Sequence, residues 1–141
     1  MNPSVTQCFS NEGALAKAIP GFKARQSQLD MANAVASAMK DKKQLVVEAG
    51  TGTGKTFAYL APALLAGRKV IVSTGTKALQ EQLFHRDLPL VKKALKPKMK
   101  TALLKGRGNY LCLYRLDQNG QHPPFDDPEF LTDMSHVRRW S

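Results

Sequence analysis

The stretch LVVEAGTGTGKT, residues 45–56, decides the fold of this 141-residue chain. An apolar run typical of a buried strand leads into alternating glycines, and Lys55-Thr56 opens a second apolar segment. Glycines let the backbone turn its N–H groups toward a phosphate, and the start of a helix adds unpaired donors and the positive end of its dipole. The stretch therefore predicts a phosphate-binding loop between a strand and a helix. A flexible Gly/Thr hairpin is the alternative, but it would not supply both flanking elements.

The last two residues of the loop have the side chains that a nucleoside triphosphate and its metal require. Lys55 can reach the β- and γ-phosphates, and the Thr56 hydroxyl suits the accompanying Mg²⁺. We therefore predict Lys55 and Thr56 as catalytic residues and Thr56 as a Mg²⁺ ligand. The strict pattern G-x-x-x-x-G-K-[ST] has Gly at position 49, where this chain has Ala49.

Gln28 is the second informative residue. Apolar residues recur at steps of three and four from Arg25 to Lys40, which predicts a helix with Gln28 at the end of its apolar face. The Gln amide pairs a donor with an acceptor and can read the N6/N7 edge of adenine. A solvent-facing Gln is the alternative, but the pattern F-x-x-R-x-x-Q ahead of the loop favours adenine recognition. The predicted ATP-binding residues are Arg25, Gln28, Ala49, Gly50, Thr51, Gly52, Thr53, Gly54, Lys55 and Thr56.

Strand and helix patterns alternate along the middle of the chain. Predicted strands cover residues 44–48, 69–73 and 100–104, and predicted helices cover 56–66, 77–86 and 90–95. Short connections between such elements require right-handed crossovers, so the fold class is α/β with a parallel sheet. Residues 1–19 are weakly patterned and are expected to form an arm with a turn of helix at residues 13–18, and a short helix is expected within residues 127–140.

A second Gly/Thr loop follows the second predicted strand at Thr74, Gly75, Thr76 and Lys77. Hydroxyls and helix N-terminal amides are good ligands for a nucleic-acid phosphate, so these four residues are predicted to contact DNA. Ordinary N-capping by Thr74 or Thr76 is the alternative, and both roles are compatible. Residues 1–116 hold 19 Lys and Arg against 6 Asp and Glu, a net +13, whereas residues 117–141 hold 2 against 5, a net −3. The basic part indicates a polyanionic partner, nucleic acid first.

The remaining features exclude several protein classes. The longest apolar run is too short to cross a bilayer, and the N-terminus has no targeting pattern, so we expect a cytoplasmic protein without a membrane partner. Cys8 and Cys112 do not make a disulfide framework, and by themselves they do not support an iron–sulfur cluster. The three His residues have no metal-binding or catalytic-triad spacing.

Four segments in order give the chain a specific resemblance. They are FKARQSQ (22–28), VVEAGTGTGKT (46–56), VIVSTGTKALQEQL (70–83) and LLKGRGNYLC (103–112). Together they resemble the N-terminal part of the bacterial DinG/YoaA helicases, relatives of the XPD helicases in superfamily 2, with the YoaA type the nearer branch. The form A-x-x-G-x-G-K-T of the loop, with Ala49, is found in that superfamily.

The resemblance implies an ATP-dependent 5′→3′ DNA helicase that acts in DNA repair or replication. It would have two RecA-like lobes, with a [4Fe–4S] domain inserted in the first, and Cys112 would be the first cluster ligand. The DNA would be single-stranded or a duplex with a single-stranded tail, and replication or repair proteins would be partners. The implied domains are an arm (1–19), an incomplete RecA-like lobe (20–108) and the start of the inserted domain (109–141).

The chain lacks several parts that such a helicase needs. It contains no DEAH sequence, and the other three cluster cysteines, the second lobe and its arginine finger are also absent. Because phosphoryl transfer depends on charged groups placed around the γ-phosphate, we expect this chain alone to bind ATP weakly, to hydrolyse little and not to unwind DNA. The mass of the native gene product would decide whether it ends at Ser141. The alternatives are a small P-loop kinase and a non-catalytic nucleic-acid-binding module.

Overall fold

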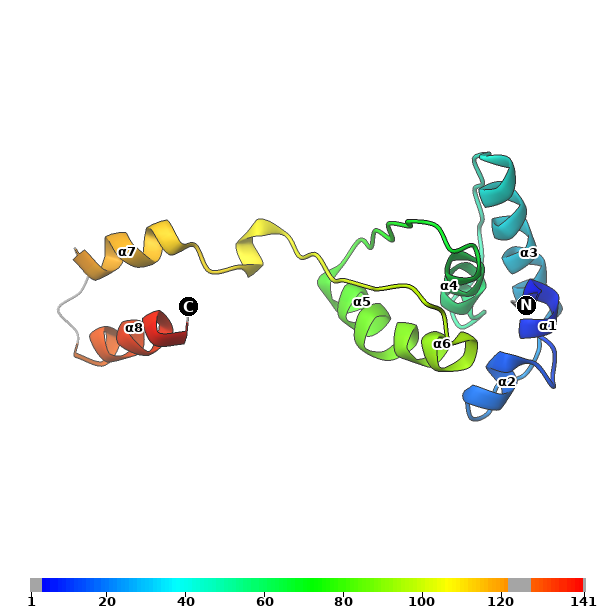
Figure 1. Ribbon diagram of the computed structural model, residues 1–141, viewed down its shortest axis with the longest axis horizontal. Coiled ribbons are helices and arrows are strands. Elements are labelled where there is room, and N and C mark those ends of the chain that lie inside the picture. The colour runs from blue at the N-terminus through cyan, green and yellow to red at the C-terminus, as the bar shows by residue number, and fades with distance from the viewer. Residues whose placement is uncertain (1–3, 122–127, 141) are drawn as a thin grey trace. The chain divides into compact units, whose positions relative to one another are not determined.

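The structure is a computed structural model that describes residues 4–121 and 128–140. The chain divides between Thr101 and Ala102 into two compact units (Figure 1), whereas the sequence predicted a boundary between residues 108 and 109.

In the described residues of the first unit, 4–101, the regular structure is helical. Its two longest helices form where the apolar periodicity and the glycine loop predict them, within one residue at each end. A π-helical turn, η1, joins the two helices that the sequence predicted at 77–86 and 90–95. The elements are α1 (Val5–Cys8), α2 (Ala14–Ala18), α3 (Gln26–Asp41), α4 (Lys55–Leu65), α5 (Lys77–Gln82), η1 (Leu83–Asp87) and α6 (Leu88–Leu95).

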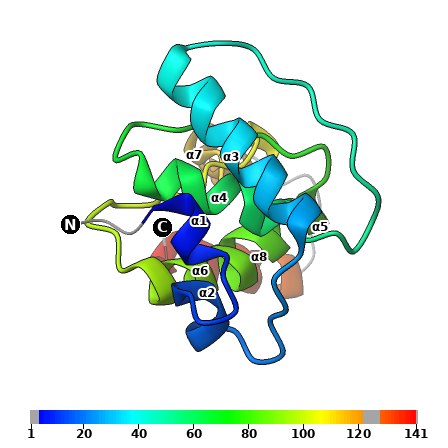
Figure 2. The same cartoon turned by 90° about the vertical axis from the view of Figure 1, so that its right-hand side faces the viewer.

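The core of this unit surrounds α4, the helix that follows the glycine loop. Six of its eleven residues are buried, and it packs against α3 and α6, with α3 and α4 side by side in Figures 1 and 2. Residues 4–19, which the sequence predicted as an arm with a helical turn at 13–18, form α1 and α2 and contribute Cys8, Phe9 and Leu15 to this core. The burial raises the pKa of the Cys8 thiol. Because α4 is buried, the helix that follows the glycine loop is held in place by the core.

The predicted parallel sheet is wrong for the described part of the chain, where no residue of 4–121 or 128–140 belongs to a strand. The runs predicted as strands lie in segments without regular structure, which Figure 1 draws as plain coil. Val46 and Ile71, at the centres of the first two runs, are 96% and 95% exposed. Hydrophobicity indicates that a segment suits a buried strand, but a strand also needs backbone partners on its neighbours. The runs predicted as strands are hydrophobic, but among the described residues they pair with no neighbouring strand.

The second unit contains a 3₁₀ turn, η2 (Arg107–Asn109), and the helices α7 (Leu113–Gln121) and α8 (Pro128–Trp140). Helix α8 matches the predicted short helix, whereas α7 was not predicted. The two helices are in contact, and Arg138 Nη2 lies 3.4 Å from Asp117 Oδ1. Among the described residues of this unit, the hydrophobic side chain of Leu116 is buried. Across the described ranges of both units, no helix has the length and apolarity to cross a membrane.

Candidate nucleotide-binding site

The glycine loop ends in two residues with left-handed backbone conformation. Gly52 has φ 76° and Gly54 has φ 80°, values that side-chain-bearing residues rarely adopt. Gly54 is also the N-cap of α4, and its carbonyl accepts hydrogen bonds from the N–H groups of Phe57 and Ala58 at 3.1 and 3.2 Å. The first amides of α4 have no acceptor within the helix and face the loop that precedes it. The predicted loop-to-helix junction is therefore present.

Two side chains from the start of α3 hold this loop. Arg25 Nη1 donates to the Gly52 carbonyl at 2.8 Å, and Gln28 Nε2 donates to the Gly54 carbonyl at 3.0 Å. Gln28 is 6% exposed, and a Cβ on Gly54 would meet its amide group. The sequence predicted both side chains as ATP ligands; the structure places both against the loop. The Gln28 amide nitrogen carries two hydrogens and its oxygen accepts, so the bond to Gly54 uses only part of the amide.

The side chains of Lys55 and Thr53 form hydrogen bonds within the loop. Lys55 Nζ donates to the carbonyls of Ala49 and Gly50 at 2.5 and 2.8 Å, and the Thr53 hydroxyl donates to the Gly50 carbonyl at 2.9 Å. The ammonium group thus lies over residues 49–50, on the loop that it is predicted to serve. A bound phosphate would replace these neutral carbonyl acceptors with charged oxygens, so that donor and acceptor would both be ionised.

A hollow of about 230 Å³ lies beside the loop at Gln28 and Arg25. Phe22 and Phe57 contribute aromatic walls, and residues 52–54 line it together with Ile19, Pro20, Gly21 and Lys23. Pockets for drug-sized ligands measure roughly 300–1,000 Å³, so this space suits one part of a nucleotide, such as its base. Apolar walls with one amide and one guanidinium fit a flat heteroaromatic ring.

Tyr59, on α4, has the Thr56 hydroxyl and the buried Asp87 carboxylate in its electrostatic surroundings. Burial raises the pKa of Tyr59, the Thr56 hydroxyl lowers it and the charge of Asp87 raises it again. The phenol therefore stays protonated at neutral pH. The sequence analysis did not single out Asp87, although it is the one acidic residue between Arg86 and Arg115.

The second Gly/Thr loop is built more simply. Thr76 is the N-cap of α5, and its hydroxyl accepts from the Leu79 N–H at 3.2 Å. The Thr74 hydroxyl donates to the Thr76 carbonyl at 3.2 Å, and Gly75 and Lys77 are exposed. No residue of α5 is buried. The predicted capping is present, and the loop remains open to solvent.

The comparisons with known proteins agree with this geometry. Residues 28–138 match the family described as DEAD/DEAH box helicase, a range that covers Gln28, the glycine loop and the second Gly/Thr loop. The chain belongs to the DEAD/DEAH box helicase family. Membership implies a RecA-like fold, so the predicted fold holds at this coarser level although the described residues form no sheet.

Three named relatives of this family confirm the resemblance to DinG/YoaA helicases. The chain is 56% identical to the ATP-dependent DNA helicase YoaA of Haemophilus influenzae and 58% identical to that of Escherichia coli K12, over 97% of its length in each case. It is 44% identical to the ATP-dependent helicase DinG of Mycobacterium tuberculosis H37Rv over 90% of its length. The matches cover 21%, 22% and 20% of these relatives, so the chain spans about a fifth of their length. No solved structure matches the chain.

The residues of the chain fit ATP and Mg²⁺ but not, by themselves, an iron–sulfur cluster. The loop amides, Lys55 and the Thr56 hydroxyl are the donor set that a Mg²⁺–triphosphate needs. A [4Fe–4S] cluster takes four thiolates, and the chain has two cysteines. Cys8 is buried in the first unit and Cys112 is exposed in the second. Within the described ranges no three His, Cys, Asp or Glu side chains gather as a metal site would require.

Proposed function

We propose that this chain is the N-terminal, ATP-binding segment of an ATP-dependent DNA helicase of 5′→3′ polarity that acts in DNA repair or replication. The observation that carries the proposal is the glycine loop of residues 49–56, held by Arg25 and Gln28 and covered by Lys55. Its support is membership of the DEAD/DEAH box helicase family and the names of the relatives.

In this proposal the loop binds the phosphates of ATP. The N–H groups of residues 50–56 surround the β- and γ-phosphates, and the Lys55 ammonium moves from the Ala49 and Gly50 carbonyls onto them. Thr56 gives its hydroxyl to Mg²⁺. Adenine occupies the hollow beside Phe22 and Phe57, where the unused half of the Gln28 amide reads its N6/N7 edge. Loop contacts and base contacts then come from neighbouring residues of one helix, α3.

Single-stranded DNA is the proposed partner of the second loop. Thr74, Gly75, Thr76 and Lys77 supply a hydroxyl, an exposed backbone and an ammonium group at the start of α5. The run of Lys residues at 92, 93, 96, 98 and 100 adds positive charge within the same unit. Binding that rests on such contacts weakens steeply with salt and depends little on base sequence. A DNA substrate would place the protein in the bacterial cytoplasm with the chromosome.

The cluster and the inserted domain belong to the protein at its native length. Cys112 is proposed as the first of four thiolate ligands because it ends the segment LLKGRGNYLC and is exposed. The chain as it stands is proposed to bind ATP weakly, with negligible hydrolysis and no unwinding, because a DEAH sequence and a second lobe are not among its residues. Replication or repair proteins are proposed partners of the native product.

ATP turnover of the native-length gene product, measured with and without single-stranded DNA, tests this function. We expect DNA-stimulated hydrolysis that Lys55→Ala abolishes, and unwinding of a duplex with a 5′ tail but not with a 3′ tail. DNA-independent phosphoryl transfer to a small acceptor would instead indicate a P-loop kinase. Salt-sensitive DNA binding that Lys55→Ala leaves unchanged, without turnover, would indicate a non-catalytic module.

A further inference from the structure

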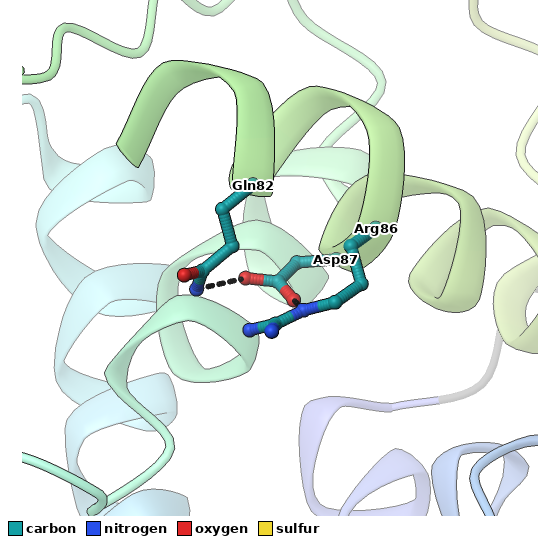
Figure 3. Close-up of polar contacts among 3 residues, drawn as sticks. All are labelled: Gln82, Arg86 and Asp87. Carbon is teal, nitrogen blue, oxygen red and sulfur yellow. Dashed lines mark hydrogen bonds and ion pairs between the residues drawn. The ribbon is translucent and has the colours of Figure 1, made fainter. Parts of the chain in front are cut away.

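Asp87 is a buried carboxylate with no part in the proposed contacts to ATP or DNA. Asp87 is 4% exposed, and the interior of a protein rarely accepts a charge that is not paired. Gln82 Nε2 donates to its Oδ2 at 3.2 Å, and Arg86 Nε donates to its Oδ1 at 2.9 Å. Figure 3 shows the Gln82 and Arg86 side chains converging on this carboxylate from the same helical stretch. Both carboxylate oxygens are therefore engaged.

This cluster of Gln82, Arg86 and Asp87 sits in a helix with an unusual hydrogen-bond register. Residues 83–87 form the π-helix η1, in which the Leu88 N–H bonds to the carbonyl of Leu83, five residues back. Single π turns inside α-helices are rare and recur at functional sites. Conversion to the α register would turn α6 by about 100° relative to α5, since successive residues are that far apart around a helix. Gln82 and Asp87, at the two ends of the turn, are held together only in the π register.

The cluster also lies between the two loops of the proposed function. Thr76 caps the start of α5, and Gln82 ends the same helix. The turn η1 in turn packs against α4, and the charge of Asp87 acts on Tyr59 of that helix. Packing contacts within the first unit thus run from the second loop through α5 and η1 to α4, the helix that begins at the first loop.

We propose that Asp87 is a positioning residue that couples the two loops: its bonds to Gln82 and Arg86 hold the π turn that joins α5 to α6 and packs against α4. Single-stranded DNA at residues 74–77 then changes the affinity for ATP at residues 50–56, and ATP changes the affinity for DNA by the same factor, as linkage requires. The inference rests on the proposed function, because it needs both ligands to bind. In this proposal Asp87 touches neither ligand, and the π turn serves to link the two loops.

The test is a titration of the chain with a fluorescent ATP analogue, with and without saturating oligothymidylate at one fixed salt concentration. Asp87→Asn removes the charge with little change of shape. Gln82→Ala alters an exposed side chain and leaves Asp87 in place, so it covers the case in which Asp87→Asn fails to fold. His85→Gln is the control, because His85 belongs to the same π turn but bonds to Glu81 and not to Asp87. Circular dichroism at 222 nm checks the fold of each variant.

We expect oligothymidylate to change the ATP affinity of the wild-type chain at least fivefold, within the usual range of allosteric coupling. In Asp87→Asn and Gln82→Ala this ratio should fall below about twofold, while the affinity for each ligand alone changes less than about threefold. His85→Gln should keep the wild-type ratio. A merely structural role would weaken both affinities and leave their ratio unchanged.

Two results would overturn the inference while leaving the proposed function standing. One is a wild-type chain that binds both ligands with no effect of either on the other. The other is a wild-type ratio retained in both Asp87→Asn and Gln82→Ala. Failure of the proposed function would look different: the wild-type chain would not bind the ATP analogue, or Lys55→Ala would bind it equally well.

Discussion

The two Gly/Thr loops of this chain, residues 50–56 and 74–77, have similar sequences and different surroundings. Each follows an apolar run, and each contains a Lys that opens a helix. The first loop is bonded by Arg25 and Gln28 from α3, and its helix α4 is mostly buried. The second loop has one side-chain cap, Thr76, and its helix α5 has no buried residue.

The difference suits two kinds of ligand. A nucleotide offers a small, fixed set of phosphate oxygens, and a loop held in advance loses little entropy when it binds them. A nucleic-acid backbone is long and repeats, so an open helix start with nearby cations binds it without a fixed pocket. The surroundings supplied by α3, rather than the glycines alone, distinguish the predicted ATP site from the predicted DNA site.

The largest contrast is expected for Ala substitutions at Gly54 and Gly75. Gly54→Ala places a Cβ on a residue with φ 80° and against the Gln28 amide. Strain in the left-handed region costs about 1–2 kcal/mol and loss of the Gln28 bond about 1 kcal/mol more, so the free energy of unfolding should fall by about 2–3 kcal/mol. A Cβ on Gly75 would have no neighbour within 4 Å, and its φ is not positive. Urea unfolding followed at 222 nm should show almost no change for Gly75→Ala, and equal losses would contradict the comparison.

Gln28 and Gln26 provide the next contrast, on one helix. Gln28→Ala removes a buried amide and leaves the Gly54 carbonyl without that donor, which should lower the free energy of unfolding by about 1–3 kcal/mol. It should also reduce the preference for ATP over GTP. Gln26 is exposed and bonds to Asp30 on the same helix at 2.7 Å, a contact worth about 0.2–0.5 kcal/mol.

Urea unfolding and competition between ATP and GTP measure the two effects of these Gln substitutions. A Gln28→Ala variant as stable and as selective as Gln26→Ala would show that α3 does not hold the loop.

Thr76→Ala should have a local effect at the second loop. Loss of an N-cap costs about 1 kcal/mol, a factor of about five in an equilibrium constant. Because α5 has no buried residue, we expect faster hydrogen exchange in residues 77–82 without a matching loss of global stability. Thr76→Ser keeps the hydroxyl and should exchange like the wild type. Global destabilisation by Thr76→Ala would mean that the second loop is held as firmly as the first.

The smallest effect concerns the two thiols and needs no substitution. A disulfide-exchange reagent should modify Cys112, which is exposed, and spare Cys8, which is buried with a raised pKa, until denaturant is added. The raised pKa of Cys8 also makes the stability of the fold depend on pH. Above the ordinary thiol pKa of 9.0 the unfolded chain loses this proton while the folded chain keeps it, so stability falls as pH rises. Rapid modification of both thiols in the folded chain would show that α1 lies outside the core.

The local elements could be predicted from the sequence, and their partners could not. Periodicity placed α3 and α4 within one residue, because their apolar faces are written in the spacing of residues 25–40 and 56–66. The strand at Val46 was predicted from hydrophobicity, yet strand formation depends on a neighbour that the pattern does not name. Arg25 and Gln28 were predicted to serve the ATP site, but their bonds to loop carbonyls were not foreseen. The proposed role of Asp87 depends on a π-helical register that the sequence pattern does not predict.

The central claim is that residues 50–56 hold a triphosphate with backbone amides under the Lys55 ammonium. Titration of a fluorescent ATP analogue into the wild-type chain, Lys55→Ala and Lys77→Ala, in the absence of DNA, tests it most directly. We expect Lys55→Ala to weaken binding at least tenfold, the loss of one charge-assisted contact of about 1.5 kcal/mol or more, and Lys77→Ala to bind like the wild type. Wild-type affinity in Lys55→Ala, or an equal loss in both variants, would contradict the account.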